Sequence, residues 1–375
     1  MKTVLVTGSS GFIGSNLVAR LAQDESVEIL RLDRNSPWDE LERALPRIDF
    51  IFHLAGINRP KCEEEFQDGN VDLTRKLLDA LIERGMKTPV LLSSSTQAER
   101  DNAYGNSKRQ AEDLVKAYGE TSGAPVFIYR LPNAFGKWCR PHYNSVVATF
   151  CHQIANGEPI QVSDRSAKLS LAYVDDIVTS FIAKITALQS NTDCLIPVIY
   201  QTTLGELADT LHGFHESRSN LFVPDCASGF ERAFYATFLS YLPRKEFSYK
   251  LKSHCDERGA FTELVKTRNS GQFSISTSKP GITRGNHFHH TKNEKFIVIK
   301  GEAVIRFRDI RSDDVFEYPV SGTQPEVVDV PPGYTHNITN TGSGEMILAI
   351  WVNEAFDPAN PDTYFEQVQP SGISS

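Results

Sequence analysis

A glycine-rich turn near the start of the chain narrows most strongly the folds that this sequence can adopt. Residues 2–7 (KTVLVT) are rich in β-branched side chains, the turn TGSSGFIG follows at 7–14, and residues 12–23 carry apolar side chains at helical spacing. Three glycines spaced in this way let a backbone turn tightly and approach a pyrophosphate, and the next helix then offers unpaired N–H groups. The succession of strand, turn and helix predicts a dinucleotide-binding unit.

Strand and helix patterns keep alternating through the first half of the chain. Apolar runs predict strands at 27–32, 49–55, 88–94 and 125–131, and helical spacing predicts helices at 71–84 and 107–118. Strands that are apolar throughout are typical of a parallel sheet covered by helices on both faces. We therefore expect an α/β fold with a Rossmann-like, doubly wound parallel sheet.

After about residue 245 the pattern changes. Short strand-like runs such as EKFIVIKG and EMILAIWV are separated by Gly, Pro, Asn and Asp, with little helical periodicity. This pattern is typical of an all-β sandwich or barrel. A helix is expected at 230–241, ended by Pro243. Two domains are therefore predicted, 1–243 and 244–375, which suits a chain too long for one typical core.

Composition excludes several classes of protein. The net charge of −8 disfavours non-specific nucleic-acid binding, which needs a basic face. The chain has no run of 18 apolar residues, so no membrane span is expected. The start MKTVLVTGSSGF does not have the pattern of a secretory signal. Six scattered cysteines without a close pair indicate free thiols and a cytoplasmic protein.

The end of the second predicted strand bears on the choice of cofactor. Asp33 could accept hydrogen bonds from ribose hydroxyls, which favours NAD, whereas Arg34 could pair with a 2′-phosphate, which favours NADP. The two residues point to different cofactors, so the choice stays open at this stage.

A serine, a tyrosine and a lysine in the 93–108 region form a candidate catalytic set. Tyr104 and Lys108 are four residues apart and would share one face of a helix. A neighbouring ammonium group is expected to lower the pKa of the phenol, which could then exchange a proton with a carbonyl or alcohol oxygen. Ser95, at the end of the preceding strand, could hydrogen-bond the same oxygen.

Residues 1–240 resemble the extended short-chain dehydrogenase/reductase family. The resemblance rests on TGSSGFIG, HLAG (53–56), GNV (69–71), the Ser…Tyr-x-x-x-Lys set, RLPNAFG (130–136) and YVDDI (173–177). It implies action on nucleotide-linked sugars, catalysis by Ser95, Tyr104 and Lys108, and a substrate site near Asn133 and Arg59. The implied cofactor contacts, besides Tyr104 and Lys108, are Gly8, Gly11, Phe12, Ile13, Gly14, Asp33, Arg34, Leu54, Ala55 and Gly56.

One departure from the family pattern narrows the expected chemistry. Dehydratases of this family carry an Asp-Glu pair after the catalytic Ser or Thr, but Thr96 and Gln97 stand there in this chain. The gap between Ser95 and Tyr104 is also unusually short. Without an acid to protonate a leaving hydroxyl, simple reduction of a ketone is favoured, with hydride from a nicotinamide and a proton from Tyr104.

A histidine cluster in the second half, GITRGNHFHHTKNEKFIVIKG (281–301), is a candidate metal site. His287 and His289 are two residues apart, so both would point to one face of a strand, whereas His290 would point to the other face. Glu294 begins the next strand-like run, and His336 follows a Pro-x-Gly turn. Three imidazoles and one carboxylate can bind a divalent transition metal with a place left for a substrate oxygen.

This spacing resembles the two motifs of the cupin family. The first motif, Gly-x5-His-x-His-x4-Glu-x6-Gly, is complete, and the second is intact from Pro331 to Asn340, although Pro325 replaces its first Gly. The resemblance implies a cupin β-barrel with a divalent metal, Zn²⁺ being expected, on His287, His289, Glu294 and His336. Lys292 and Lys295 are expected to be solvated.

A reductase followed by a cupin resembles the bifunctional enzymes of capsular-polysaccharide and O-antigen synthesis. The likeness extends through AGINRP (55–60), NAFGKWC (133–139), YNSVVATFC (143–151), GNHFHHTKNEKF (285–296) and DPANPDTYF (357–365). It implies a cytoplasmic homodimer that acts on a UDP-deoxysugar, UDP-2-acetamido-2,6-dideoxy-4-ketohexose. The cupin would epimerise carbon 3, and the reductase would then use NADPH, with NADH still open, to make UDP-N-acetyl-6-deoxy-L-talosamine.

Several alternatives stay open. The cupin could only bind substrate or build a dimer, beside a plain nucleotide-sugar 4-ketoreductase. The chain could instead be a regulatory NADP-binding protein without turnover, although the intact Ser–Tyr–Lys set disfavours this. The metal could be catalytic or structural, and Tyr334, His290 and Lys292 are candidates for the epimerase base, with none singled out.

Overall fold

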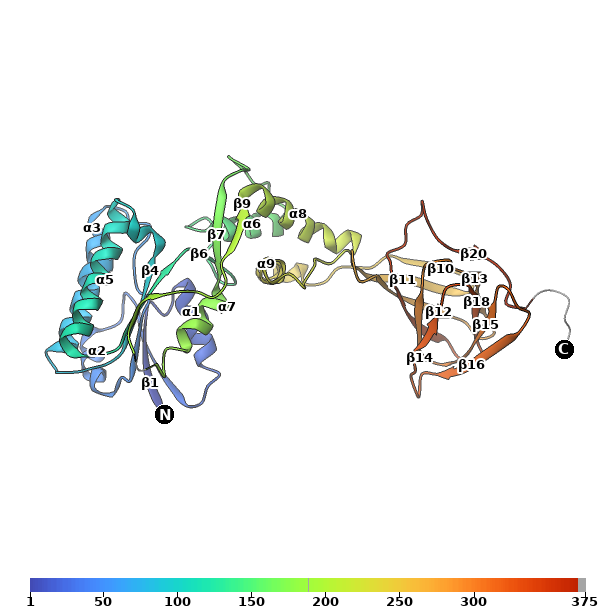
Figure 1. Cartoon of the computed structure of the whole chain (residues 1–375), viewed down its shortest axis with the longest axis horizontal. Helices are drawn as coiled ribbons and strands as arrows, with labels where there is room; N and C mark the ends of the chain where they lie inside the picture. Colours follow the sequence, from blue (N-terminus) through green and yellow to red (C-terminus); the bar gives the residue numbers. More distant parts are fainter. Residues whose placement is uncertain (188, 370–375) are drawn as a thin grey trace. The chain divides into compact units, whose positions relative to one another are not determined.

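The computed structural model describes residues 1–187 and 189–369. These residues form two compact units (Figure 1). The first contains residues 1–212 and 229–243, and the second contains residues 213–228 and the chain from 244 onward. Residues 213–228 group with the second unit because Val223 N–H donates to the carbonyl of Lys266, and Lys266 N–H donates to that of Leu221. That residues 1–243 and 244–375 fold as separate domains stays a prediction.

The first unit is built on a parallel sheet of six strands in the order β2-β1-β3-β4-β5-β8. All five pairings between neighbouring strands are parallel. The expected βαβ alternation is therefore confirmed. The strands are β1 (Lys2–Thr7), β2 (Val27–Leu32), β3 (Phe50–His53), β4 (Val90–Ser95), β5 (Val126–Leu131) and β8 (Asn191–Cys194).

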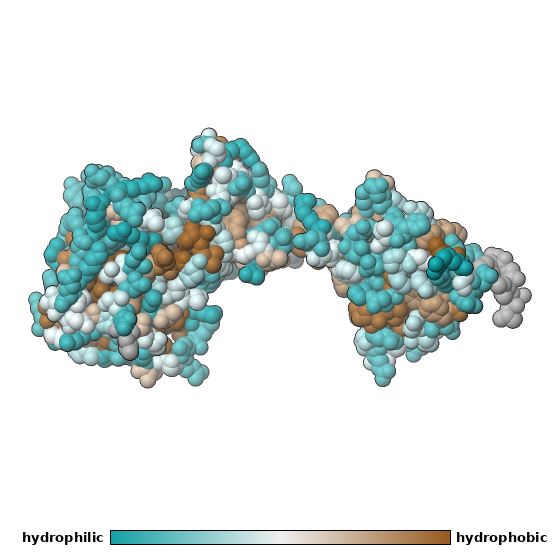
Figure 2. All heavy atoms as spheres, in the orientation of Figure 1, coloured by the Kyte–Doolittle hydropathy of each residue, from teal (hydrophilic) through white to brown (hydrophobic). Residues whose placement is uncertain are grey.

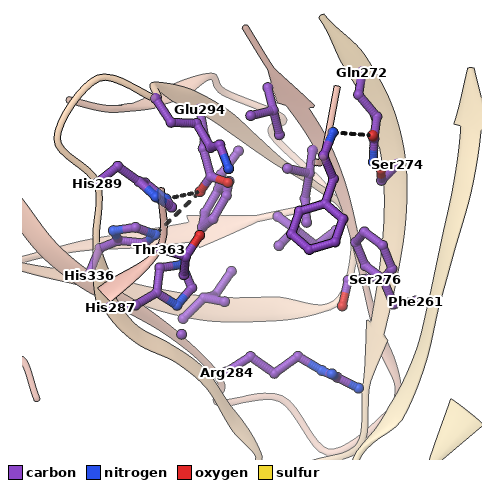
Figure 3. Close-up of a pocket in the computed structure, with 18 of the residues that line it drawn as sticks. Phe261, Gln272, Ser274, Ser276, Arg284, His287, His289, Glu294, His336 and Thr363 are labelled. Carbon is purple, nitrogen blue, oxygen red and sulfur yellow. Dashed lines mark hydrogen bonds and ion pairs between the residues drawn. The ribbon is translucent and has the colours of Figure 1, made fainter. Parts of the chain in front are cut away.

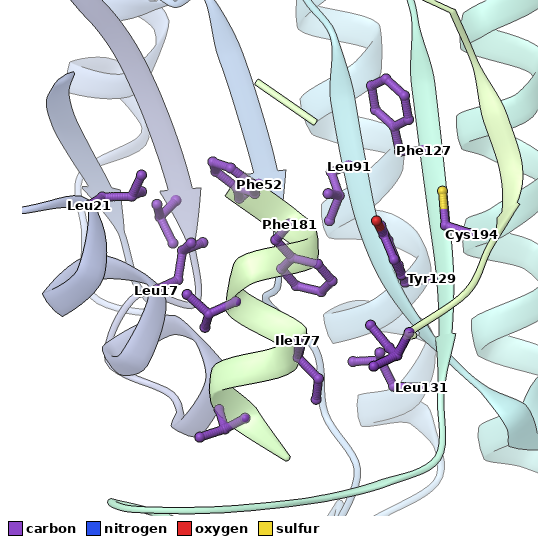
Figure 4. Packing of buried hydrophobic residues seen from close by; sticks show 14 of the residues in the cluster. Leu17, Leu21, Phe52, Leu91, Phe127, Tyr129, Leu131, Ile177, Phe181 and Cys194 are labelled. Carbon is purple, nitrogen blue, oxygen red and sulfur yellow. The ribbon is translucent and has the colours of Figure 1, made fainter. Parts of the chain in front are cut away.

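Neighbouring side chains of each strand point to opposite faces of the sheet, so an apolar strand gives two apolar faces. Helices cover both faces and bury them. In β1, for example, Val4 and Val6 join one core cluster and Leu5 joins the other. The first cluster packs under α1 (Phe12–Leu21) and α7 (Val174–Ile182), as Figure 4 shows. The second cluster packs under α2 (Trp38–Ala44), α4 (Leu73–Ile82) and α5 (Ala103–Ser122).

Outside the main sheet the chain forms a smaller sheet and further helices. A smaller sheet has the order β6-β7-β9, with β6 (Asn133–Phe135), β7 (Lys168–Tyr173) and β9 (Tyr200–Thr203). The helix expected at 230–241 is α9 (Gly229–Leu239). Sequence periodicity did not predict α2, α6 (Val146–Ala155), α7 or α8 (Leu204–Asn220). The remaining short helical segments are η1 (Leu45–Arg47), α3 (Glu64–Phe66), the π-helix η2 (Gln67–Asp72), η3 (Thr96–Glu99) and, in the second unit, η4 (Arg244–Glu246).

The second unit is built on two sheets, and every pairing between their strands is antiparallel. One sheet has the order β10-β11-β12-β19-β14-β17, and the other has the order β16-β15-β18-β13-β20. The expectation of an all-β second half is confirmed. The strands are β10 (Ser253–Asp256), β11 (Gly259–Lys266), β12 (Gln272–Ser278), β13 (Thr283–Phe288), β14 (Glu294–Lys300), β15 (Glu302–Asp309), β16 (Val315–Ser321), β17 (Val328–Val330), β18 (Tyr334–Asn340), β19 (Met346–Val352) and β20 (Tyr364–Phe365).

Strand β12 departs from the usual apolar-inside pattern. Its buried side chains are polar (Gln272, Ser274, Ser276 and Ser278), whereas Phe273 is exposed. Figure 2 also shows hydrophobic residues on the surface of the second unit. The exposed large hydrophobic residues of this unit include Ile299, Val315, Phe316 and Val327. None of the described helices combines the length and the apolar character that a membrane span requires.

Candidate active site and metal site

The glycine-rich turn after β1 packs too tightly for side chains. Gly8 has a φ of +67°, which glycine adopts readily. A Cβ on Gly14 would lie 2.1 Å from the Gly8 carbonyl oxygen, and one on Gly8 would lie 2.8 Å from the Ala55 backbone. Helix α1 begins just after, and its N-cap residue, Gly11, supplies no side-chain cap. The turn thus fits a group that needs close backbone approach and helix N–H donors, as a pyrophosphate does.

Asp33, at the end of β2, holds this turn in place. Its carboxylate accepts hydrogen bonds from Ser9 Oγ at 2.6 Å, from Ser10 N–H at 3.0 Å and from Ser10 Oγ at 2.9 Å. Partial burial would raise the pKa of this carboxyl, but the hydrogen bonds from Ser9 and Ser10 hold it below its ordinary value. Arg34 beside it is exposed. The roles of both residues in cofactor binding remain expectations.

The segment that follows β3 is hydrogen-bonded to Thr7, the last residue of β1. The N–H groups of Leu54 and Ala55 donate to Thr7 Oγ1 at 3.2 and 3.1 Å. His53 is buried and contacts Thr7 and Thr74, each at 2.8 Å. Burial, with Lys108 nearby, lowers the pKa of His53 to about 3, so this imidazole is neutral in the folded protein.

Ser95, Tyr104 and Lys108 come from adjacent elements. Ser95 ends β4, and the other two lie four residues apart on α5, which begins with Asn102 as its N-cap. The helix can approach η3 because a Cβ on Gly105 would lie 2.3 Å from the Gln97 carbonyl oxygen. Ser95 lies close enough to the Tyr104 hydroxyl to favour its ionised form, which opposes the effect of burial on the pKa of the phenol. The structure thus brings the phenol and the serine together, as a proton transfer to one substrate oxygen requires.

The expected lowering of the Tyr104 pKa is wrong for this structure. Burial raises the pKa of the phenol, and the hydrogen bond from Ser95 opposes that rise only in part. Lys108 is itself buried, and its ammonium donates to the Ser93 carbonyl at 2.7 Å. Burial lowers the pKa of Lys108 to about 8, against the opposing charge of Glu112.

A buried acid–base network behind this set was not predicted. Glu112 accepts a hydrogen bond from Ser94 Oγ at 2.5 Å and one from Arg130 Nη2 at 2.6 Å. Its side chain is 1% exposed. The sequence held one signal of it, since Tyr104, Lys108 and Glu112 follow each other at four-residue intervals on α5.

The predicted substrate residues lie on separate elements. Asn133 begins β6, Arg59 lies in the segment after β3, and both are exposed. Their part in substrate binding stays a prediction.

In the second unit, His287, His289, Glu294 and His336 gather around one point. One ligand atom from each of the four lies within 4.8 Å of those of the others. His287 on β13 faces His336 on β18 across the sheet, after a register shift at Asn286, whose φ is +62°. Glu294 Oε2 lies 3.3 Å from His336 Nε2 and 3.7 Å from His289 Nε2 (Figure 3).

The chemistry of these four side chains fits a divalent metal. Within the described residues, His289 Nε2, His336 Nε2 and Glu294 Oε2 are buried without a hydrogen-bond partner, which is costly unless a ligand satisfies them. Burial, together with His336, lowers the pKa of His287 to about 4. Burial alone would raise the pKa of Glu294, but the flanking imidazoles of His289 and His336 bring it well below its usual range. Neutral imidazole and ionised carboxylate are the ligand forms that metals bind, and His287 and Glu294 are held in these forms.

These residues lie at one side of a cavity of about 380 Å³. Polar side chains of β12 (Gln272, Ser274 and Ser276) and Phe261 lie at the other side, with Arg284 along the edge (Figure 3). Gln272 Nε2 donates to Glu263 and to Ser274, each at 3.0 Å.

The three candidates for the epimerase base are placed differently. Lys292 is buried and lines the cavity, which corrects the expectation that it is solvated. Its ammonium donates to the Pro361 carbonyl at 2.6 Å. Lys295 is half exposed and pairs with Asp329. His290 is exposed and its ring packs against Tyr364, whereas Tyr334 packs against Phe316.

Fold and site together define a dinucleotide-binding, reductase-type unit joined to an all-β unit with a candidate metal site in its cavity. The chain belongs to the NAD dependent epimerase/dehydratase family, whose model matches residues 4–196. Residues 254–364 match the polysaccharide biosynthesis C-terminal domain.

Individual relatives agree with this assignment. The chain is 48% identical over 362 residues to UDP-2-acetamido-2,6-beta-L-arabino-hexul-4-ose reductase of Pseudomonas aeruginosa, covering 96% of this chain and 97% of that protein. It is 50% identical, with a TM-score of 0.91, to the capsular polysaccharide assembling protein CapF from Staphylococcus aureus, covering 97% of this chain and 100% of that one. The resemblance to capsular-polysaccharide enzymes is thereby confirmed.

A more distant structure supports the fold alone. A UDP-N-acetylglucosamine 4-epimerase from Methanobrevibacter ruminantium is 23% identical, with a TM-score of 0.54, over 64% of this chain and 98% of that one.

Proposed function

We propose that this protein is a bifunctional nucleotide-sugar enzyme. The first unit reduces a carbon 4 ketone with NADPH, and the second, a cupin barrel, epimerises carbon 3 of the same sugar. The observation that carries the proposal is the presence of two separate sites, a Ser95–Tyr104 pair beside Lys108 in one unit and a four-ligand cluster in a cavity of the other.

The proposed substrate is UDP-2-acetamido-2,6-dideoxy-4-ketohexose, and the product is UDP-N-acetyl-6-deoxy-L-talosamine, a precursor of capsule or O-antigen. The name of the Pseudomonas aeruginosa relative, a reductase of a UDP-linked 2-acetamido-2,6-dideoxy-4-ketosugar, supports this substrate class. The match to a polysaccharide biosynthesis domain supports the pathway class.

For the reduction, a bound nicotinamide would supply the hydride that attacks carbon 4. Tyr104 then gives its hydroxyl proton to the carbonyl oxygen, and Ser95 donates a hydrogen bond to the same oxygen. The pKa of Lys108, about 8, leaves this buried ammonium charged at neutral pH. Its charge favours the phenolate that forms as Tyr104 loses its proton.

For the epimerisation, the C–H bond at carbon 3 breaks on one face of the sugar and re-forms on the other. The hydrogen is acidic because the neighbouring ketone accepts the negative charge as an enolate. A divalent metal would be held by His287, His289, Glu294 and His336 and would supply a Lewis acid; we propose Zn²⁺, which binds imidazole nitrogen and carboxylate oxygen. Buried polar side chains on β12 can bind the sugar across the cavity.

Two features support NADPH over NADH. The carboxylate of Asp33 already accepts three hydrogen bonds from the glycine-rich turn, which leaves it less free to bind ribose hydroxyls. The exposed Arg34 next to it could pair with a 2′-phosphate.

The proposal includes a homodimer in the cytoplasm. Exposed apolar side chains of the second unit, among them Ile299, Phe316 and Val327, support an interface there. All six cysteines are free thiols, which suits a reducing compartment. Light scattering of the purified protein would give the mass; a monomer at micromolar concentration would contradict the dimer.

The division of labour can be tested with UDP-4-keto-6-deoxysugars. NADPH oxidation reports the reduction, and NMR in deuterated water reports exchange and configuration at carbon 3. Tyr104→Phe should lose NADPH oxidation and keep the exchange, whereas His289→Ala should lose the exchange. Tyr143→Phe, which changes a tyrosine of the first unit with an exposed fraction of 37%, is the matched control.

Each outcome has a distinct meaning. If Tyr104→Phe loses both activities, the two reactions do not belong to separate sites. If the exchange persists at full rate in His289→Ala, the barrel is not the epimerase. The plain 4-ketoreductase, with a barrel that only binds substrate or mediates dimerisation, then accounts for the activity.

A further inference from the structure

The C-terminal run DPANPDTYF has so far no part in either site. Residues 356–365, here called the closing segment, return to the second unit after β19. The backbone N–H of Phe356 donates to Gln272 Oε1 at 3.1 Å at one end, and Tyr364 and Phe365 pair with β13 at the other. Between these anchors Thr363 lines the cavity, on the side of the metal-site residues (Figure 3).

Asp362, in the middle of this segment, binds the loop that follows His289. Its Oδ1 accepts the N–H of His290 at 3.0 Å, and its Oδ2 accepts the N–H groups of Thr291 and Lys292 at 2.9 and 2.8 Å. The Thr291 hydroxyl also donates to Oδ2, at 3.0 Å. One carboxylate therefore satisfies three successive backbone donors in the loop between two predicted metal ligands, His289 and Glu294.

The backbone of Asp362 acts on His289 directly. Its carbonyl oxygen lies 2.6 Å from His289 Nδ1, so Nδ1 carries the proton and donates it. Nε2, the nitrogen that faces Glu294, is then the free ligand atom. A hydrogen bond of this kind sets both the tautomer and the ring orientation of a metal-binding histidine.

Asp362 holds this position at a cost in backbone energy. Its φ is +40°, in the left-handed region that L residues other than Asn and Asp rarely adopt. Such conformations persist where surrounding contacts over-determine them, and they cluster at functional sites. Glycine would suit the backbone better, so the carboxylate is the reason to expect an aspartate here.

We infer that the Asp362 carboxylate is a positioning group for the metal site: it fixes the 290–292 loop and, through these bonds, holds the Asp362 carbonyl where that carbonyl orients His289. This inference rests on the metal site of the proposed function. The closing segment thereby completes the metal site, although Asp362 is 73 residues away from His289 in the sequence.

The test compares Zn²⁺ binding, by competition with a chromogenic chelator, in the full-length protein and two glycine variants. Asp362→Gly removes the carboxylate and relieves the backbone, and we expect its Zn²⁺ affinity to fall by about 10- to 100-fold. Asp357→Gly is the matched control, because Asp357 caps only Ala359 and Asn360 within the same segment. Its affinity should equal that of the parent protein.

A spectroscopic measurement distinguishes a residue that orients the metal ligands from one that only stabilises the fold. With Co²⁺ in place of Zn²⁺, the visible absorption bands report ligand geometry, and they should change in Asp362→Gly but not in Asp357→Gly. Asp362→Asn keeps the size of the side chain, but its amide NH2 group replaces one of the two oxygens that accept backbone N–H groups. It should therefore behave like Asp362→Gly. It provides the test if Asp362→Gly does not fold.

The outcomes are distinguishable. Unchanged affinity and unchanged Co²⁺ bands in Asp362→Gly would overturn the role of Asp362 and leave the metal site standing. If the parent protein itself binds neither Zn²⁺ nor Co²⁺, the proposed metal site is wrong, and so is the role inferred for Asp362.

Discussion

Arg130 donates to both carboxylate oxygens of Glu112, through Nε at 2.9 and 3.2 Å and through Nη2 at 2.6 Å. The carboxylate end of this pair is 1% exposed, and the guanidinium end is 35% exposed. Burial would raise the pKa of Glu112, but the hydrogen bonds from Arg130 and Ser94 keep it below its ordinary value. The pair therefore stays ionised beneath the Ser95–Tyr104–Lys108 set.

Replacing Glu112 with Gln should destabilise the protein substantially. The variant keeps the side-chain volume but leaves the guanidinium of Arg130 without its charged partner, and breaking such a pair costs roughly 3 kcal/mol. Urea unfolding would measure the change. Asp113→Asn is the control, because Asp113 lies beside it on α5 with a 65% exposed side chain. A loss no larger than that of the control would contradict this role of Glu112.

Features that lie within a short stretch of sequence could be predicted, because their geometry depends on local spacing. The turn at Gly8 and the pairing of Tyr104 with Lys108 on one helix are of this kind. So is the cluster of His287, His289 and Glu294, whose members lie within eight residues of one another.

Features that depend on distant contacts could not be predicted in this way. The partners of Asp33 lie on the glycine-rich turn, and the buried carboxylate of Glu112 meets Arg130 only when β5 packs beside α5. Lys292 looked like a surface charge because nothing local shows that the closing segment covers it. The raised pKa of Tyr104 likewise follows from burial, which the spacing of side chains does not reveal.

Lys108 should make the stability depend on pH above neutrality. Burial lowers its pKa from 10.5 to about 8 in the folded protein, so between these values the unfolded chain binds more protons. Stability contributed by this group therefore rises as pH increases from 8 to 10.5, by up to about 1.4 kcal/mol per pH unit. Below pH 8 both states bind the proton and the slope vanishes.

The measurement is the free energy of unfolding in urea at pH 7, 8.5 and 9.5, for the parent protein and for Lys108→Met. The difference between the two isolates this lysine from other groups that titrate in the same range. We expect the parent protein to gain stability relative to Lys108→Met as pH rises. A constant difference across the three pH values would mean that Lys108 keeps an ordinary pKa.

Zn²⁺ should stabilise the protein through the second unit. A ligand that binds only the folded state adds about 2.7 kcal/mol at a hundred times its Kd, which raises the melting temperature. His336→Ala should abolish the Zn²⁺-dependent rise, because it removes a buried ligand atom of the cluster. His290→Ala should keep the rise, because His290 is exposed and packs against Tyr364. A rise that survives in His336→Ala would place the ion elsewhere.

Gly14→Ala should weaken both the fold and the binding of NADPH. Its Cβ would lie 2.1 Å from the Gly8 carbonyl oxygen, so the turn must open, at a cost of about 1–3 kcal/mol for overpacking. Gly213→Ala is the matched control, because that glycine lies in α8 and a Cβ there would meet nothing within 4 Å beyond the adjoining backbone of its own helix. There the change should stabilise the helix by about 0.5–1 kcal/mol. Urea unfolding and NADPH fluorescence measure the two effects, and tight NADPH binding by Gly14→Ala would show that the turn does not need its close packing to hold the cofactor.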